Sequence, residues 1–135
     1  MTFCAGQAIL IKGLPFPDKS ISEKFRPYLI VKVTDSDLYL LNVSSIGTKE
    51  KFMKSLRFEN KAIRKFNPPF KLQSFVKMDS LVCVSVKYAK DWHPLDGGKT
   101  LDDGELADIV AEMHNRNLWT PFLKIGEDGT HYFKE

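Results

Sequence analysis

The 135-residue chain has few cysteines and histidines. Its two cysteines, Cys4 and Cys83, stand in no Cys-x-x-Cys pattern, and its three histidines are scattered. We therefore expect reduced thiols, no metal site and no cofactor. Cys83 lies in an alternating apolar run, which predicts a buried small side chain rather than a catalytic thiol.

Long apolar segments are also missing. No stretch approaches the roughly 20 apolar residues of a membrane-spanning helix. The N-terminal residues lack the basic-then-apolar order of a secretory signal. We therefore expect a cytoplasmic protein with no membrane partner. A composition of 43% hydrophobic and 27% charged residues is ordinary for a globular protein, and the length predicts a single domain over residues 1–135.

Charge is small in total but uneven along the chain. The net charge is +3, yet residues 49–71 contain eight Lys or Arg against two acids, and residues 91–135 contain four against ten. The first region attracts polyanions and the second repels them.

Two apolar runs in the N-terminal half predict an antiparallel hairpin. Residues 28–31 and 38–43 read as strands, and the polar cluster at 34–37 suits the turn between them. Pro27 biases Arg26 toward extended backbone angles. Antiparallel pairing then brings Arg26 near the end of the second strand, where Ser44 and Ser45 follow. A guanidinium beside hydroxyls is a plausible phosphate site.

The order of these motifs resembles the MazF/PemK family, the ribonuclease half of bacterial type II toxin-antitoxin pairs. The resemblance runs from about Gly6 to Ala89. Its motifs, in chain order, are Gly6-x-x-Ile9, the loop Pro15-Phe16-Pro17-Asp18, the strand start Lys24-x-Arg26-Pro27, and a strand ending in Ser44-Ser45. It implies a mainly β fold, namely a compact SH3-like antiparallel β-barrel over about residues 6–90 with a C-terminal helix and short extra helices.

The resemblance also implies an activity: metal-independent cleavage of single-stranded RNA, in which the ribose 2′-hydroxyl attacks the adjacent phosphorus. The catalytic residues it suggests are Arg26, Ser44, Ser45 and Asp79. A late strand is predicted over residues 75–89, where valines alternate with Cys83, Ser85 and Lys87. Asp79 depends on one of two registers for this strand, and the other register, which we prefer for the strand, places Ser85 at that position. Outside the resemblance, Arg26 could be a surface ion pair with Glu23 or Asp18, and the serines a strand-ending turn.

RNA-binding residues are expected in the loop, the basic region and the late strand. They are Phe16, Asp18, Lys24, Lys49, Lys51, Lys54, Arg57 and Lys77. The loop at 13–23 either borders the RNA site or is a plain surface loop. By the resemblance, the partners are single-stranded RNA, a cognate antitoxin protein and a second copy of the chain in a homodimer.

Residues 46–69 allow two interpretations. The segment around residues 51–56 is either a short helix or irregular. Phe52, Phe58 and Phe66 alternate with cations, a combination that suits bases and phosphates of single-stranded RNA. Alternatively, the rings pack into the core beneath a solvated basic face.

The last third of the chain contains the clearest helix signal. Asp102 with Glu105 three residues later predicts a capping box, and a helix over about 102–116 carries an apolar stripe of Leu106, Ile109, Val110 and Met113. A turn signal at 127–129 predicts a small hairpin within the tail, residues 117–135. That tail could cover the barrel, mediate dimer contacts or do neither.

Two non-enzymatic functions compete with the ribonuclease. One is a toxin on the same barrel that binds a protein target, as gyrase poisons do. The Arg26-Pro27 strand argues against it, and the chain ends Tyr132-Phe133-Lys134-Glu135 without the Trp-Gly-Ile ending of that relative. The other is an SH3-like barrel that only binds RNA or protein.

Overall fold

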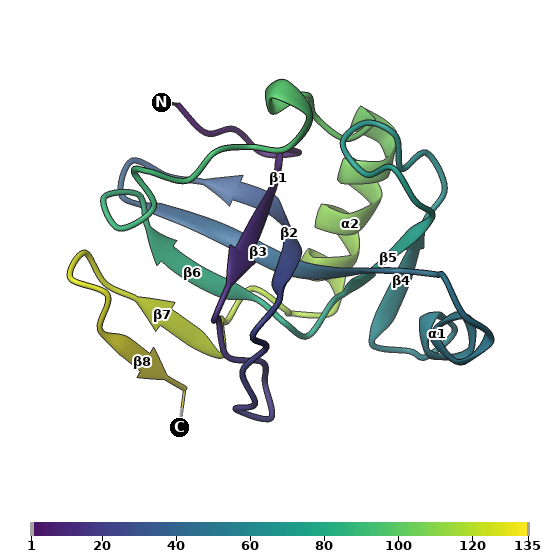
Figure 1. Ribbon diagram of the computed structural model, residues 1–135, viewed down its shortest axis with the longest axis horizontal. Helices are drawn as coiled ribbons and strands as arrows, with labels where there is room; N and C mark the ends of the chain where they lie inside the picture. The colour runs from purple at the N-terminus through teal and green to yellow at the C-terminus, as the bar shows by residue number, and fades with distance from the viewer. Residues whose placement is uncertain (1, 135) are drawn as a thin grey trace.

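The computed structural model describes residues 2–134 as a mainly β protein with two α-helices and one short 3-10 helix (Figure 1). The strands are β1 (Ala8–Lys12), β2 (Phe25–Val33), β3 (Asp37–Ser45), β4 (Asn60–Ile63), β5 (Ser74–Lys77), β6 (Val82–Ser85), β7 (Leu123–Ile125) and β8 (His131–Phe133). The helices are α1 (Lys49–Ser55), η1 (Asp96–Gly98) and α2 (Asp103–Asn115).

The strands form one sheet that branches at β3. The main path runs β1-β2-β3-β6-β7-β8, while β5 pairs with the end of β3 and carries β4. All pairings are antiparallel except β6 with β7. The mainly β class is thus confirmed. Within residues 2–134 no strand pairing joins β1 to β8, so the sheet is open and a closed SH3-like barrel is not confirmed.

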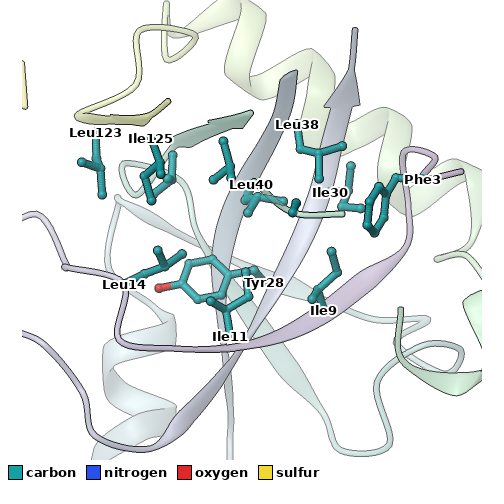
Figure 2. Close-up of a cluster of buried hydrophobic side chains, with 13 residues drawn as sticks. Phe3, Ile9, Ile11, Leu14, Tyr28, Ile30, Leu38, Leu40, Leu123 and Ile125 are labelled. Atoms are coloured by element: carbon teal, nitrogen blue, oxygen red, sulfur yellow. The ribbon is translucent and has the colours of Figure 1, made fainter. Parts of the chain in front are cut away.

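Two hydrophobic clusters fill the two faces of the sheet. Along β2, Tyr28 and Ile30 belong to the first cluster, whereas Leu29 and Val31 belong to the second, which also receives α2. Successive strand residues point to opposite faces, so β2 is buried on both. Figure 2 shows the first cluster, to which β1, β2, β3 and β7 each contribute two side chains. Burial raises the pKa of the Tyr28 phenol to about 12, which keeps it protonated.

The predicted hairpin is confirmed as β2 and β3. Its register pairs Tyr28 with Asn42 and Leu29 with Leu41. Asn42 is buried, and its side-chain amide donates to the carbonyl oxygen of Pro27 at 3.3 Å while its backbone N–H donates to Ser80 Oγ at 2.9 Å. These bonds satisfy a polar group that would be costly to bury unpaired.

The strand predicted over residues 75–89 is in fact two strands, β5 and β6. They are separated by a turn in which the Ser80 hydroxyl and N–H both donate to the carbonyl of Lys77, at 2.6 and 3.2 Å. Cys83 is buried, as predicted, and Ser85 is buried like the valines beside it. β6 lies between β3 and β7 and is covered on both faces. Burial raises the pKa of the Cys83 thiol.

Both helices begin at the kind of residue that the sequence indicates. For α1, the Thr48 hydroxyl accepts from Lys51 N–H at 3.1 Å, which confirms the short helix. For α2, Asp102 accepts from Glu105 N–H at 3.1 Å. The predicted capping box is half formed, because the Glu105 carboxylate instead accepts from the N–H groups of Arg64 and Lys65, at 3.1 and 2.9 Å.

The tail forms the predicted hairpin and joins the sheet. β7 pairs with β6, and Leu123 and Ile125 are buried in the first cluster, so the tail covers that side of the core. On α2, Ile109 and Met113 are buried, whereas Val110 is half-buried and outside the second cluster. No helix within residues 2–134 has the length and apolar character needed to cross a membrane.

Candidate functional site: two adjoining cavities

The first cavity, called here the Arg26 cavity, has a volume of about 390 Å³ and lies where β2 enters the sheet and β3 leaves it. Three predicted catalytic residues, Arg26, Ser44 and Ser45, line it together with Lys51 from α1. Other lining residues come from segments distant in the sequence: Pro69, Phe70, Lys71, Leu72, Leu95 and Asp96. Leu10 of β1 and Phe25 of β2 also line this cavity.

The antiparallel register explains why these residues meet. Pairing of Tyr28 with Asn42 places Arg26 across from Ser44 when the register is extended by two residues. On its other side, Arg26 pairs with Ile11 of β1. The side chain therefore extends from a central strand, which fixes the position of its Cα between two neighbours.

Arg26 is held by a hydroxyl and not by a carboxylate. Its Nε donates a hydrogen bond to Ser22 Oγ at 3.1 Å, and Ser22 Oγ also accepts from Lys24 N–H at 3.1 Å. Over residues 2–134, no Asp or Glu oxygen lies within 4.0 Å of its guanidinium, so the alternative ion pairs with Glu23 and Asp18 do not form. The charge of Arg26 is therefore not neutralised by a bound carboxylate.

The second cavity, called here the Lys77 cavity, also has a volume of about 390 Å³. Six predicted site residues line it: Phe16, Asp18, Lys54, Arg57, Lys77 and Asp79. Residues that the sequence did not indicate complete the wall: Pro17, Glu59, Asn60, Phe75 and Ser80. The predicted residues thus divide between two cavities.

Lys77 connects the two cavities electrostatically. Burial and then the charges of Arg26 and Lys54 lower the pKa of its ammonium, with a smaller contribution from Lys51, and Asp79 opposes them. Arg26 and Lys51 line the first cavity, whereas Lys54 and Asp79 line the second. Lys77 therefore lies near enough to the cations of both cavities to be repelled by them.

The loop between β1 and β2, residues 13–24 and called here the β1–β2 loop, supplies Phe16, Pro17 and Asp18 to the Lys77 cavity, and its Ser22 contacts Arg26 of the other cavity. The Lys77 ammonium lies 5.4 Å from the ring centroid of Phe16, within the range of a cation–π contact. Asp18 is exposed and accepts from the hydroxyl and N–H of Ser20 at 2.6 and 2.9 Å, and these bonds lower the pKa of the carboxyl. The loop therefore borders the Lys77 cavity.

The α1 region presents its rings to solvent. Phe52 is 49% exposed and Phe58 is 81% exposed, so the alternative that they pack in the core is wrong for these two. The Arg116 guanidinium lies 4.0 Å from the Phe58 ring centroid. Phe66 is half-buried against the second cluster, where that alternative holds.

Some predicted site residues line neither cavity, and Asp79 lies in an exposed turn. Lys24 and Lys49 are exposed and line neither cavity. Asp79 is exposed in the turn after β5. Ser85, the alternative to Asp79, pairs with Asp37 at the opposite end of β3 from Ser44, which removes it from the site.

The residues missed by sequence reasoning come mostly from long-range contacts. Ser22 had a local signal, since it precedes Arg26 by four residues in the loop. The cavity-lining residues 69–72 and 95–96 had none. Within residues 2–134, no group of three or more His, Cys, Asp or Glu side chains is arranged to hold a metal ion. The chain matches no model of a known protein family, and no curated protein is significantly similar to it.

Proposed function

We propose that this protein is a metal-independent endoribonuclease toxin of a type II toxin-antitoxin system, which cleaves single-stranded RNA at short sequence motifs. The observation that carries the proposal is that Arg26, Ser44 and Ser45 line one cavity, with the Arg26 guanidinium free of any carboxylate partner among residues 2–134. An unpaired guanidinium fork is suited to bind and stabilise a phosphoryl group.

In the proposed reaction, the ribose 2′-oxygen attacks the adjacent phosphorus and the bond to the 5′-oxygen breaks. The products are a 2′,3′-cyclic phosphate and a 5′-hydroxyl end. Arg26 stabilises the negative charge that develops on the phosphoryl oxygens, and Ser44 or Ser45 donates a hydrogen bond to the same phosphate. Asp79, one of three carboxylates that line the Lys77 cavity, would accept the 2′-proton, and the departing 5′-oxygen would take a proton from solvent.

The cations that line the two cavities support RNA as the substrate. Lys51, Lys54, Arg57 and Lys77 would contact phosphates, and the exposed ring of Phe52 and the half-buried ring of Phe16 would stack on bases. The same charges would attract the acidic segment of an antitoxin.

The family's fold and dimeric state belong to the same proposal. The first cluster receives side chains from β1, β2, β3, β6 and β7, an enclosure that supports an SH3-like barrel arrangement. Leu10, Phe25 and Leu72 line the Arg26 cavity and are 45%, 62% and 65% exposed. An apolar rim of this kind suits a second copy of the chain.

The test is to incubate the purified protein with a long single-stranded RNA in EDTA and to map the fragment ends. Wild-type protein should cut at a short recurrent sequence and leave 5′-hydroxyl ends. Arg26→Ala should cleave about 10²- to 10³-fold more slowly while binding RNA with similar affinity. Arg64→Ala, which removes an exposed arginine outside both cavities, should cleave at the wild-type rate.

Two outcomes would contradict the proposal. Absence of cleavage by antitoxin-free wild-type protein would leave a protein-targeting toxin or a binding module as the function. Cleavage that is unchanged in Arg26→Ala would remove Arg26 from the site.

A further inference from the structure

The C-terminal hairpin touches the β1–β2 loop. In β8, the ring centroid of Phe133 lies 5.3 Å from the ammonium of Lys19, which is at the tip of that loop. Figure 1 shows the loop and β8 on the same side of the molecule. This contact links the last strand of the chain to the loop that lines the Lys77 cavity.

The hairpin is firmly attached to the core and can serve as a fixed support. Leu123 and Ile125 of β7 are buried in the first cluster. Phe122 N–H donates to the carbonyl of Leu81 at 3.1 Å, and Lys134 N–H donates to the carbonyl of Phe122 at 2.9 Å. Hydrogen bonds therefore hold the hairpin just before β7 and just after β8, next to Phe133.

The tip of the loop is closed by several internal hydrogen bonds. Phe16 N–H donates to the carbonyl of Ser20 at 2.9 Å, and Lys19 N–H donates to the carbonyl of Phe16 at 2.7 Å. Asp18 closes the same turn through its two hydrogen bonds from Ser20. Lys19 is therefore connected through these hydrogen bonds to Phe16 and Asp18, which line the Lys77 cavity.

Two cation–π contacts hold this tip from two sides. Phe133 contacts Lys19 from the tail, and Lys77 contacts Phe16 from β5, at 5.3 and 5.4 Å. Each is an exposed or partly exposed contact, so each makes a modest contribution. Together they restrict the tip to one position over the Lys77 cavity.

We propose that the C-terminal hairpin positions the β1–β2 loop for substrate binding, and that Phe133 is the positioning residue. The inference rests on the proposed RNA function for its effect on cleavage, whereas its effect on the loop is independent of that function. Phe133 touches no reacting atom. It acts through Lys19 on Phe16 and Asp18.

The test compares Phe133→Ala with Tyr132→Ala, which removes a more exposed ring from the same strand. Loss of an exposed cation–π contact corresponds to about a two- to fivefold change in an equilibrium constant. We expect faster amide hydrogen exchange at residues 16–20 in Phe133→Ala only. We also expect its KM for single-stranded RNA to rise about two- to fivefold with kcat nearly unchanged. Phe133→Trp, which retains an aromatic face, should restore both values.

The two readouts separate this inference from the proposed function. If wild-type protein does not cleave RNA, the proposed function fails, and hydrogen exchange still decides whether Phe133 positions the loop. If wild-type protein cleaves RNA but exchange at residues 16–20 is the same in Phe133→Ala and Tyr132→Ala, the inference is overturned. An unchanged melting temperature in all three variants confirms that the effects are local.

Discussion

The Nε atom of Arg26 donates a hydrogen bond to the hydroxyl of Ser22 at 3.1 Å. This bond connects Arg26, in β2, to the β1–β2 loop. Ser22→Ala should release one edge of the guanidinium and lower kcat for RNA cleavage about tenfold, less than Arg26→Ala. Ser36→Ala, which changes an exposed serine in the turn between β2 and β3, is the matched control. A wild-type kcat in Ser22→Ala would show that the bond does not orient Arg26.

Lys77 should make stability depend on pH. Burial, then Arg26, lowers the pKa of Lys77 below its usual 10.5, so protonated Lys77 reduces stability below the lowered pKa. That loss decreases as pH rises through the lowered pKa and is gone above 10.5. Lys77→Met should therefore raise the melting temperature at pH 7, and its advantage over wild type should narrow toward pH 10.5.

The matched control for this pH dependence is Lys24→Met, because Lys24 is exposed and lines neither cavity. Its melting temperature should follow that of wild type at both pH values. A constant difference between Lys77→Met and wild type across the pH range would contradict the effect of burial on Lys77.

Phe52 should contribute to RNA affinity and little to stability. Its ring is 49% exposed on α1, so Phe52→Ala should change the free energy of unfolding by no more than about 0.5 kcal/mol. Loss of one stacked base should weaken binding of single-stranded RNA about 5- to 100-fold. Equilibrium unfolding and fluorescence anisotropy with a labelled RNA measure the two effects.

Phe66→Ala gives the opposite pattern and serves as the comparison for Phe52. Phe66 packs against the second cluster, so its truncation should reduce stability by about 2 kcal/mol or more and affect RNA binding less. Equal destabilisation by the two variants would mean that Phe52 also belongs to the core.

Asp102 should stabilise α2 through its side chain. Asp102→Ala removes the acceptor for Glu105 N–H and should lower the free energy of unfolding by about 1 kcal/mol. Urea denaturation should show a lower midpoint with an unchanged slope. Asp108→Ala, on the exposed face of the same helix, should leave the midpoint close to that of wild type.

The elements that the sequence predicted well are those with local signals. Two apolar runs around a polar turn determined the pairing of β2 with β3, and therefore the meeting of Arg26 with Ser44. Asp102 marked the start of α2 to the residue. These features depend on neighbours in the chain, which a single sequence displays directly.

The elements that were missed depend on contacts between distant segments. The valines in residues 75–89 suggested one strand, but the turn at Ser80 divides it into two. The Ser80 hydroxyl accepts a hydrogen bond from the N–H of Asn42, which holds this turn against β3. The division of predicted site residues between two cavities follows from packing of residues 69–72 and 95–96 against β1 to β3. The link from Phe133 to Lys19 spans nearly the whole chain, and no local pattern in either segment indicates it.

The parallel pairing of β6 with β7 has a consequence for the order of folding. The β2–β3 hairpin closes through a short turn, whereas β7 can reach β6 only after the long connection that contains α2 has formed. Closing a longer connection costs more chain entropy, so local pairings tend to form first. We therefore expect Arg26 and Ser44 to come together early and the C-terminal hairpin to dock late. The β1–β2 loop would then acquire its final support in the last stage of folding.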